Sequence, residues 1–333
     1  MRPTPLLVAA LLAGAAITQD PGTTKPATAV RLVYELPVDA LQRAHRGDPD
    51  FDLERALADT IANVARRMPE RAEVTRGDGA TFAVGLWRDS ERLITQARAL
   101  VETAGTFEMR IVANGDYAGG DVRFDLAAER AALQAWLDAG GRERLAADPT
   151  VIREFTPGNR ALGWYVHRIE VDPDAAGRWQ TPLARSVPDA VVAAYRDSDW
   201  NDGAVPPQLR QQPAEARFLV ELVALNLHEE HFDNADLDPD GVAATQDGNG
   251  QPAVDYRLVD ARAMAYSDWS ARNVDQHAAM VWNGEVLRAP RFLCRIPGHG
   301  RITGLPTRDA RAVAQAMVAP LPFPPKLLRI ERP

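Results

Sequence analysis

Cysteine is nearly absent from this sequence of 333 residues, because Cys294 is the only one. A disulfide within the chain is therefore excluded. Cys294 lies in the apolar run RFLCRI, which predicts a strand with the thiol buried as a small apolar side chain. Since apolar surroundings disfavour a thiolate, we expect no nucleophilic or redox role for this residue.

The sequence also lacks a concentrated basic region. Its formal net charge is −8 and its pI is near 5.4, and the arginines are interleaved with acidic residues. Nucleic acids and anionic membranes are bound by clustered lysine and arginine, so we exclude nucleic acid as a partner. With 46% hydrophobic and 25% charged residues, the composition is that of an ordinary globular protein.

Long apolar runs are missing too, apart from one near the N-terminus. The run from Leu6 to Ile17 follows Arg2 and contains the small residues Ala13-Gly14-Ala15. It is shorter than the roughly 20 residues that cross a bilayer. We therefore predict a signal peptide over residues 1–19, and hence an exported, periplasmic or cell-envelope protein. An uncleaved N-terminal anchor is the alternative.

After this leader, residues 28–114 alternate between strand-like and helical patterns. Apolar residues recur at helical spacing from Leu53 to Met68, with Asp50 or Asp52 available as the N-cap. The order β-α-β-β-α-β predicts a ferredoxin-like split βαβ unit. The predicted elements are a strand (30–36), a helix (51–68), a hairpin around Gly77-Asp78-Gly79 (73–87), a helix (89–104) and a strand (106–113).

Residues 115–215 are less regular. They contain one helical pattern at 126–141, which we expect to end at the glycine pair Gly140-Gly141, and a strand-like run at 163–171. Proline-rich turns interrupt the remainder. We predict that this segment is an insertion, whose fold the sequence does not specify.

Residues 216–328 return to alternating strands and helices. Asn283-Gly284 predicts a type I′ hairpin turn, because both residues tolerate positive φ. Thr307 is the expected N-cap of a helix that ends before Pro320. The fold class is therefore α+β, with antiparallel sheets and an inserted segment. The predicted elements are strands at 216–227, 253–259 and 301–306, a helix at 263–274, the hairpin at 277–293 and a helix at 308–318.

Motifs in the last third resemble the soluble first periplasmic domain (base plus head) of SecD, the accessory subunit of the bacterial Sec translocase. The first part matches more loosely, through the helix end Ala65-Arg66-Arg67-Met68 and the segments 73–87 and 97–112. The resemblance covers residues 30–113 and 216–325. Its motifs are, in order, Val281, Asn283-Gly284, Val286, Ala289-Pro290, Ile302-Thr303-Gly304, Thr307 and Leu321-Pro322.

This resemblance implies a non-catalytic module that engages emerging or unfolded polypeptide, or a component of the Sec translocase. It implies no catalytic residue, cofactor or metal. In the family, further membrane helices couple export to the proton gradient, and we expect this module to act without them. One departure is that Ala319-Pro320 stands where the family has glycine before the Leu-Pro exit.

Two histidines raise the alternative of a metal-dependent enzyme. A zinc-protease helix places histidines at i and i+4, with a glutamate as base, whereas His228 and His231 in HEEH are three residues apart. The preceding run FLVELVALNL is strand-like. We therefore prefer a polar strand end to a zinc site.

The aspartate run that follows raises the alternative of a calcium-dependent module. Asp236, Asp238, Asp240 and Gly241 fit positions 1, 3, 5 and 6 of a calcium loop, and Asp247 fits position 12. The usual helix pair is missing, and aspartate and glycine are also ordinary turn residues. Both interpretations of this loop stay open at this point.

The other histidines and tryptophans give no further site. His45, His167, His277 and His299 lie in unrelated segments, so we expect structural or solvated roles for them. Tryptophans are more often core or interface residues than a ligand box. We expect this of Trp164, Trp200, Trp269 and Trp282.

Overall fold

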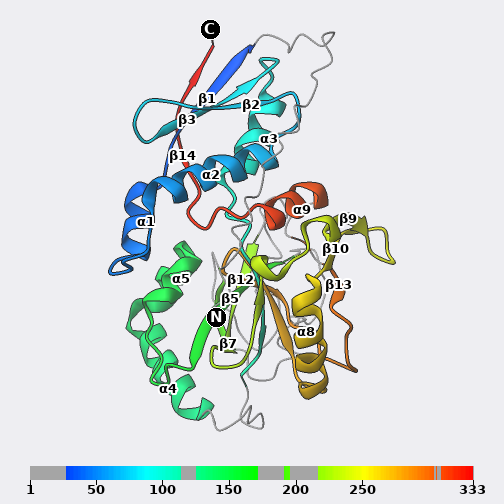
Figure 1. The fold of residues 1–333 in the computed structure, drawn as a ribbon. Coiled ribbons are helices and arrows are strands. Elements are labelled where there is room, and N and C mark those ends of the chain that lie inside the picture. Colours follow the sequence, from blue (N-terminus) through cyan, green and yellow to red (C-terminus); the bar gives the residue numbers. More distant parts are fainter. Residues whose placement is uncertain are drawn as a thin grey trace, which may run out of the picture.

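The computed structural model describes residues 28–113, 125–171, 191–195, 217–303, 305 and 309–332. Figure 1 shows two units, which we call the base (28–102 and 321–332) and the head (the described residues between 107 and 318). The leader over residues 1–19 and Trp200 lie outside the described residues. Within the described ranges, none of the helices combines the length and the apolar character that a membrane span requires.

The base is one four-stranded sheet with helices. The strands follow the order β14-β1-β3-β2, and each neighbouring pair is antiparallel. Its elements are β1 (Val30–Glu35), α1 (Val38–Ala44), α2 (Leu53–Arg67), β2 (Glu73–Arg76), β3 (Thr81–Leu86), α3 (Glu91–Glu102) and β14 (Lys326–Glu331).

Alternation along the strands places the base core on one face of this sheet. Leu32 and Tyr34 of β1 lie opposite Val84 and Phe82 of β3, and all four are buried. Helix α2 begins at the predicted Asp52, whose carboxylate accepts from the Arg55 backbone amide. Apolar side chains of α2 and α3 pack on the same cluster, each contributing roughly 1.5–3 kcal/mol where fully buried.

The predicted fourth strand of the base is in another sheet. Strand β4 (Phe107–Ile111) pairs with β11 and β8 of the head. The place beside β1 is taken by β14, which is more than 200 residues away along the chain. Strand β14 therefore forms one edge of the base sheet beside β1, and both ends of the described chain lie in the base.

The head is built on a seven-stranded sheet in the order β6-β7-β5-β12-β11-β4-β8. Only the β12–β5 pair is parallel, and the other pairs are antiparallel. The predicted type I′ turn is present, with φ of 53° at Asn283 and 82° at Gly284. The new strands are β5 (Leu162–Val171), β6 (Val191–Tyr195), β7 (Arg217–Asn226), β8 (Phe232–Asp233), β11 (Ala278–Trp282) and β12 (Glu285–Arg288).

The middle segment contributes to this same sheet. Strand β5 pairs with β7 from Leu162 to Val171, and helices α4 (Leu126–Trp136) and α5 (Arg142–Ala147) cover it. The first helical stretch ends at the glycine pair, as predicted, because the backbone is non-helical at Ala139 and at Gly140, where φ is 100°. A second helix, α5, begins directly after Gly141. The described residues of this segment are therefore part of the head.

A second layer of the head consists of a three-stranded antiparallel sheet, β13-β10-β9, and two helices. Trp269 is fully buried between Phe232, Tyr266 and Phe292, with ring centroids 5.0–5.6 Å apart within this group. The elements are β9 (Ala243–Gln246), β10 (Pro252–Arg257), α8 (Asp260–Arg272), β13 (His299–Ile302) and α9 (Ala310–Val318).

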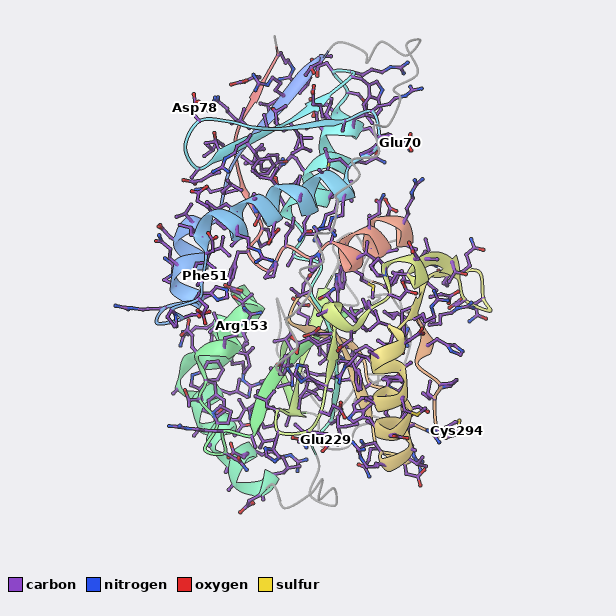
Figure 2. All side chains as sticks on the ribbon, in the orientation of Figure 1. Phe51, Glu70, Asp78, Arg153, Glu229 and Cys294 are labelled. Atoms are coloured by element: carbon purple, nitrogen blue, oxygen red, sulfur yellow. The ribbon has the colours of Figure 1, made fainter. Side chains whose placement is uncertain are left out.

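Three local predictions in this part of the head were wrong. Cys294 is exposed in an irregular segment (Figure 2). Of the residues before it, Phe292 is buried and Leu293 is 78% exposed. Strand β13 is shifted relative to the predicted 301–306. Helix α9 is capped by Asp309, whose carboxylate accepts from the Ala312 amide, whereas Thr307 lies outside the described residues.

Candidate functional site

The HEEH segment forms a turn at the end of β7. The buried Asn226 side chain accepts from the backbone amides of His228 and Glu229, at 2.9 and 3.0 Å. These two hydrogen bonds form where strand β7 ends, and they place His228 and His231 on an irregular segment. The helix that a zinc protease needs is therefore not formed.

Both glutamates of HEEH face arginines of α8. Arg262 donates to Glu230 at 3.1 Å and to the His231 carbonyl at 3.3 Å, and its guanidinium lies 4.7 Å from the centre of the Phe232 ring. Arg272 lies 3.6 Å from Glu230 and 4.0 Å from Glu229. Figure 2 labels Glu229 at this end of the head. The acidic pair thus fastens the turn to α8.

The aspartates of the next turn are also bonded to arginines and backbone amides. Asp236 accepts from the Arg262 side chain at 2.7 Å and from the Asp233 amide at 3.0 Å. Asp238 accepts from Arg257 Nε at 2.9 Å, and this hydrogen bond lowers the pKa of the Asp238 carboxyl. The turn is therefore anchored to β10 and α8 by charge-assisted hydrogen bonds.

These contacts do not favour the metal interpretations. Among the residues described, no three histidine, cysteine, aspartate or glutamate side chains converge on a common point. Asp247 is engaged locally, since it accepts from the amides of Asn249 and Gln251. The aspartates that were spaced like calcium ligands therefore stabilise two successive turns.

These turns lead directly into β9, which is an edge strand. The turn after β9 has the Asp247 amide donating to Gln251 and Gly250 at φ of 75°, which is a hairpin with a glycine bulge. Register then pairs Thr245 with Ala253 and Ala244 with Val254. Since bonded and non-bonded pairs alternate, the N–H and C=O of Ala244 point away from β10.

The free side of β9 has few of the features that protect sheet edges. Its residues, AATQ, include no charged side chain and no proline, and Ala243, Ala244 and Gln246 are exposed. The edge strands of the base, in contrast, carry charged residues: β2 reads EVTR and β14 reads KLLRIE. Strand β9 is thus less protected than the edge strands of the base, and it shares the lack of charge and proline with β6 (VVAAY) at one edge of the seven-stranded sheet.

The remaining predicted residues are separate from this edge. Trp164, Trp269 and Trp282 are buried core residues. Each of the other histidines has a local partner: His45 stacks on Phe51 with centroids 4.2 Å apart, His167 bonds Glu221 at 3.0 Å, and His277 and His299 each lie 2.8 Å from a backbone carbonyl. These contacts fit structural roles.

Sequence reasoning missed β9 as a strand, although a signal was present. Residues 242–246 read VAATQ, a short uncharged segment between two turn signals, DPDG and DGNG. Such a segment between turns is typical of a short strand. The aspartates on both sides of this segment match a calcium loop, so the segment was interpreted as part of that loop and not as a strand.

Comparisons with known proteins return no matching family model and no curated protein. Three solved structures of SecDF are similar to this chain. One, in a super-membrane-facing form, has 17% identity and a TM-score of 0.48, and the similarity covers 93% of this chain and 32% of that one. This chain thus spans about a third of that SecDF chain.

The second structure is described as a membrane component SecDF that enhances protein export. It has 18% identity and a TM-score of 0.46, over 90% of this chain and 99% of that one. The third, SecDF from Thermus thermophilus, has 17% identity and a TM-score of 0.27, over 92% of this chain and 31% of that one. These are structures of the family that the sequence motifs resemble.

Proposed function

We propose that this chain is an exported, non-catalytic SecD-like module that binds unfolded polypeptide in protein export. An extended segment of the polypeptide adds to the free edge of β9 and extends the sheet β13-β10-β9 by one strand. The base is proposed to be a ferredoxin-like unit in which β14 supplies the fourth strand. A component of the Sec translocase is the proposed partner that delivers or receives the polypeptide.

The exposed backbone of Ala244 is the observation that carries this proposal. Main-chain hydrogen bonds to an edge strand give affinity without selecting a particular side-chain sequence, as a module for many polypeptides requires. The arginine contacts of Asp236 and Asp238 fix the turn that precedes it.

Fluorescence anisotropy with a labelled, permanently unfolded protein tests the proposal, with the folded form of the same protein as comparison. We expect weak binding of the unfolded form only, insensitive to calcium. Ala244→Pro should weaken it by about tenfold, because one or two hydrogen bonds of roughly 1 kcal/mol each are lost. The substitution spares the β9–β10 ladder, since this amide points away from β10.

Ala244→Ser is the matched control, because it changes the side chain and keeps the backbone donor. It should bind like the unsubstituted protein. Equal affinity for folded and unfolded forms, or an Ala244→Pro variant that binds normally, would show that β9 is not the binding edge. Turnover of a small substrate would contradict the non-catalytic assignment.

The signal peptide gives a separate prediction. If residues 1–19 are a cleaved leader, the protein recovered from the cell envelope should begin after Ala15 or near Ile17. Intact mass measures this directly. A full-length product that requires detergent would show instead that the run is a retained anchor.

A further inference from the structure

Two aspartates flank the edge strand β9, one beyond each end. Asp240 stands three positions before Ala243, the first residue of β9, and Asp247 directly follows the last residue, Gln246. Ala244, whose backbone N–H and C=O point away from β10, lies between them. An extended segment that pairs with this edge would therefore have an acidic group of the protein near each of its ends.

The other acidic residues beside β9 are neutralised by arginines. Asp255 of β10 accepts from Arg301 Nε and Nη2, at 2.6 and 3.0 Å. Asp238, in the turn before β9, accepts from Arg257 Nε at 2.9 Å. In each pair a guanidinium bonds a carboxylate directly, which is the strong, charge-assisted form of hydrogen bond. Both arginines are therefore occupied by these partners.

The carboxylate of Asp240 is only weakly neutralised in comparison. Asp240 is exposed, and its backbone amide donates to Asp238, but its carboxylate accepts no hydrogen bond from a residue that the structure describes. The hydrogen bond to Asp238 is the main cause of the raised pKa of Arg257, and the charge of Asp240 is the smallest. Asp240 is therefore available to a cation from outside the protein.

Charges on the neighbouring described elements do not reverse this excess of acid. The pKa of Arg301 is raised first by its hydrogen bond to Asp255 and least by the charge of Asp247. Helix α9 packs against β9 and contains one charged residue, Arg311. Since Asp240 and Asp247 together outnumber this arginine, the free edge of β9 is acidic overall.

The two acidic flanks define the same pattern for either direction of a bound strand. Asp247 is three positions from Ala244 along the chain, and Asp240 is four. In a segment centred opposite Ala244, residues three or four positions from the centre therefore come close to the aspartates, whether the pairing is parallel or antiparallel. Cationic side chains at these positions attract the aspartates, and anionic side chains repel them.

We propose that β9 favours extended polypeptide segments that carry a basic residue on each side of a short uncharged core. This preference rests on the proposed function, because the backbone of Ala244 pairs with the core and the aspartates contact only the flanks. Exposed ion pairs are individually weak, so the preference is modest and other sequences still bind. The favoured client is thus an unfolded polypeptide with cationic segments.

Fluorescence anisotropy with two labelled peptides tests the preference. Both peptides share one uncharged core, and they differ only in having lysine or glutamate three and four positions from its centre. At low salt we expect the lysine peptide to bind about tenfold more tightly, because two attractive contacts replace two repulsive ones. In 1 M salt the difference should disappear, since charges are then screened within about 3 Å.

Asp240→Asn and Asp247→Asn remove each charge with almost no change of shape. Asp247→Asn also keeps a side-chain oxygen that can accept the two backbone amides of the turn. Each variant should weaken the lysine peptide about threefold and tighten the glutamate peptide. Asp78→Asn is the matched control, since Asp78 is exposed in the β2–β3 turn of the base (Figure 2). It lowers the same net charge of −8 and should leave both affinities unchanged.

The outcomes separate this preference from the proposed function. Equal affinity for the two peptides would overturn the preference, and so would an effect of Asp78→Asn as large as that of Asp240→Asn, which would reveal attraction to the overall charge. If Ala244→Pro weakens both peptides while they bind equally, the proposed function stands and the preference alone is wrong. If Ala244→Pro leaves the lysine peptide unaffected, β9 is not the binding edge and both proposals fail.

Discussion

Tyr34 shows how a single polar atom limits stability. Its ring is fully buried in the base and stacks on Phe82 with centroids 5.3 Å apart. The hydroxyl has no hydrogen-bond partner in the described part of the chain. Because a buried unsatisfied hydroxyl costs about 1 kcal/mol or more, Tyr34→Phe should raise the free energy of unfolding by roughly 1 kcal/mol in urea denaturation.

The same residue predicts an alkaline effect. Burial raises the pKa of Tyr34 well above the ordinary value of 10. Above pH 10 the unfolded chain loses this proton and the folded chain does not, so the unsubstituted protein loses stability as the pH rises. The gain from Tyr34→Phe should therefore be larger at pH 11 than at pH 7. A loss of stability in the variant at pH 7 would contradict this account.

Asp238 provides the test of the metal alternative. We expect neither calcium, zinc nor chelation with EDTA to shift the melting temperature, because Asp236 and Asp238 already bond arginines. Asp238→Ala should melt slightly lower than the unsubstituted protein in every condition. A calcium-dependent rise in melting temperature that this variant abolishes would restore the calcium interpretation.

At the residue scale, spacing suggested ligands but could not reveal the partners. HEEH follows strand β7 and is not helical, so His228 and His231 do not share a helix face as the histidines of a zinc protease do. The arginines that bind the acidic residues, Arg257 and Arg262, are 19 to 32 residues distant along the chain. Only the pairing of β10 and the packing of α8 bring them to the loop. Likewise, nothing in the sequence around Arg67 indicated that its side chain would be buried.

At the element scale, most helices and strands were predictable because their apolar periodicity matches the face that they bury. Helix α2 and its Asp52 cap, and the Asn283-Gly284 turn, are examples. Strand partners were not predictable. The alternation in β4 fits any antiparallel sheet, and the choice between the base and the head depends on competition with β14 for the edge of β1.

Two glycines with positive φ allow a prediction at this scale. Gly140 has φ of 100° with open space around an added Cβ, so Gly140→Ala should cost about 1 kcal/mol of strain. Gly105 has φ of 72°, and a Cβ there would lie 2.5 Å from the Ala316 carbonyl oxygen. Gly105→Ala should therefore cost roughly 3 kcal/mol, since overpacking adds to strain.

Urea denaturation of the two variants measures this difference. Both substitutions add one methyl group at a residue with positive φ, so the difference between their costs measures how closely Gly105 is packed against Ala316 of α9. Equal losses of unfolding free energy for Gly105→Ala and Gly140→Ala would mean that Gly105 is not packed against Ala316 as closely as described.

At the scale of the whole molecule, the α+β class and the antiparallel sheets followed from the sequence, and the structure confirms them. The division into base and head did not follow, because it depends on the chain returning to the base through β14. The segment 115–215 was separated on its irregular composition, yet its strand β5 lies between β7 and β12 of the head. Long-range pairing, which local patterns do not encode, decided both features.

Backbone hydrogen exchange at Ala244 tests the central claim most directly. In the free protein this amide points away from β10 and should exchange rapidly, whereas the Thr245 amide should be protected. With a saturating unfolded polypeptide, we predict that exchange at Ala244 slows and that exchange at Thr245 changes little. Binding that leaves Ala244 unprotected, or equal protection by the folded form of the same protein, would contradict the proposal that β9 receives an extended polypeptide.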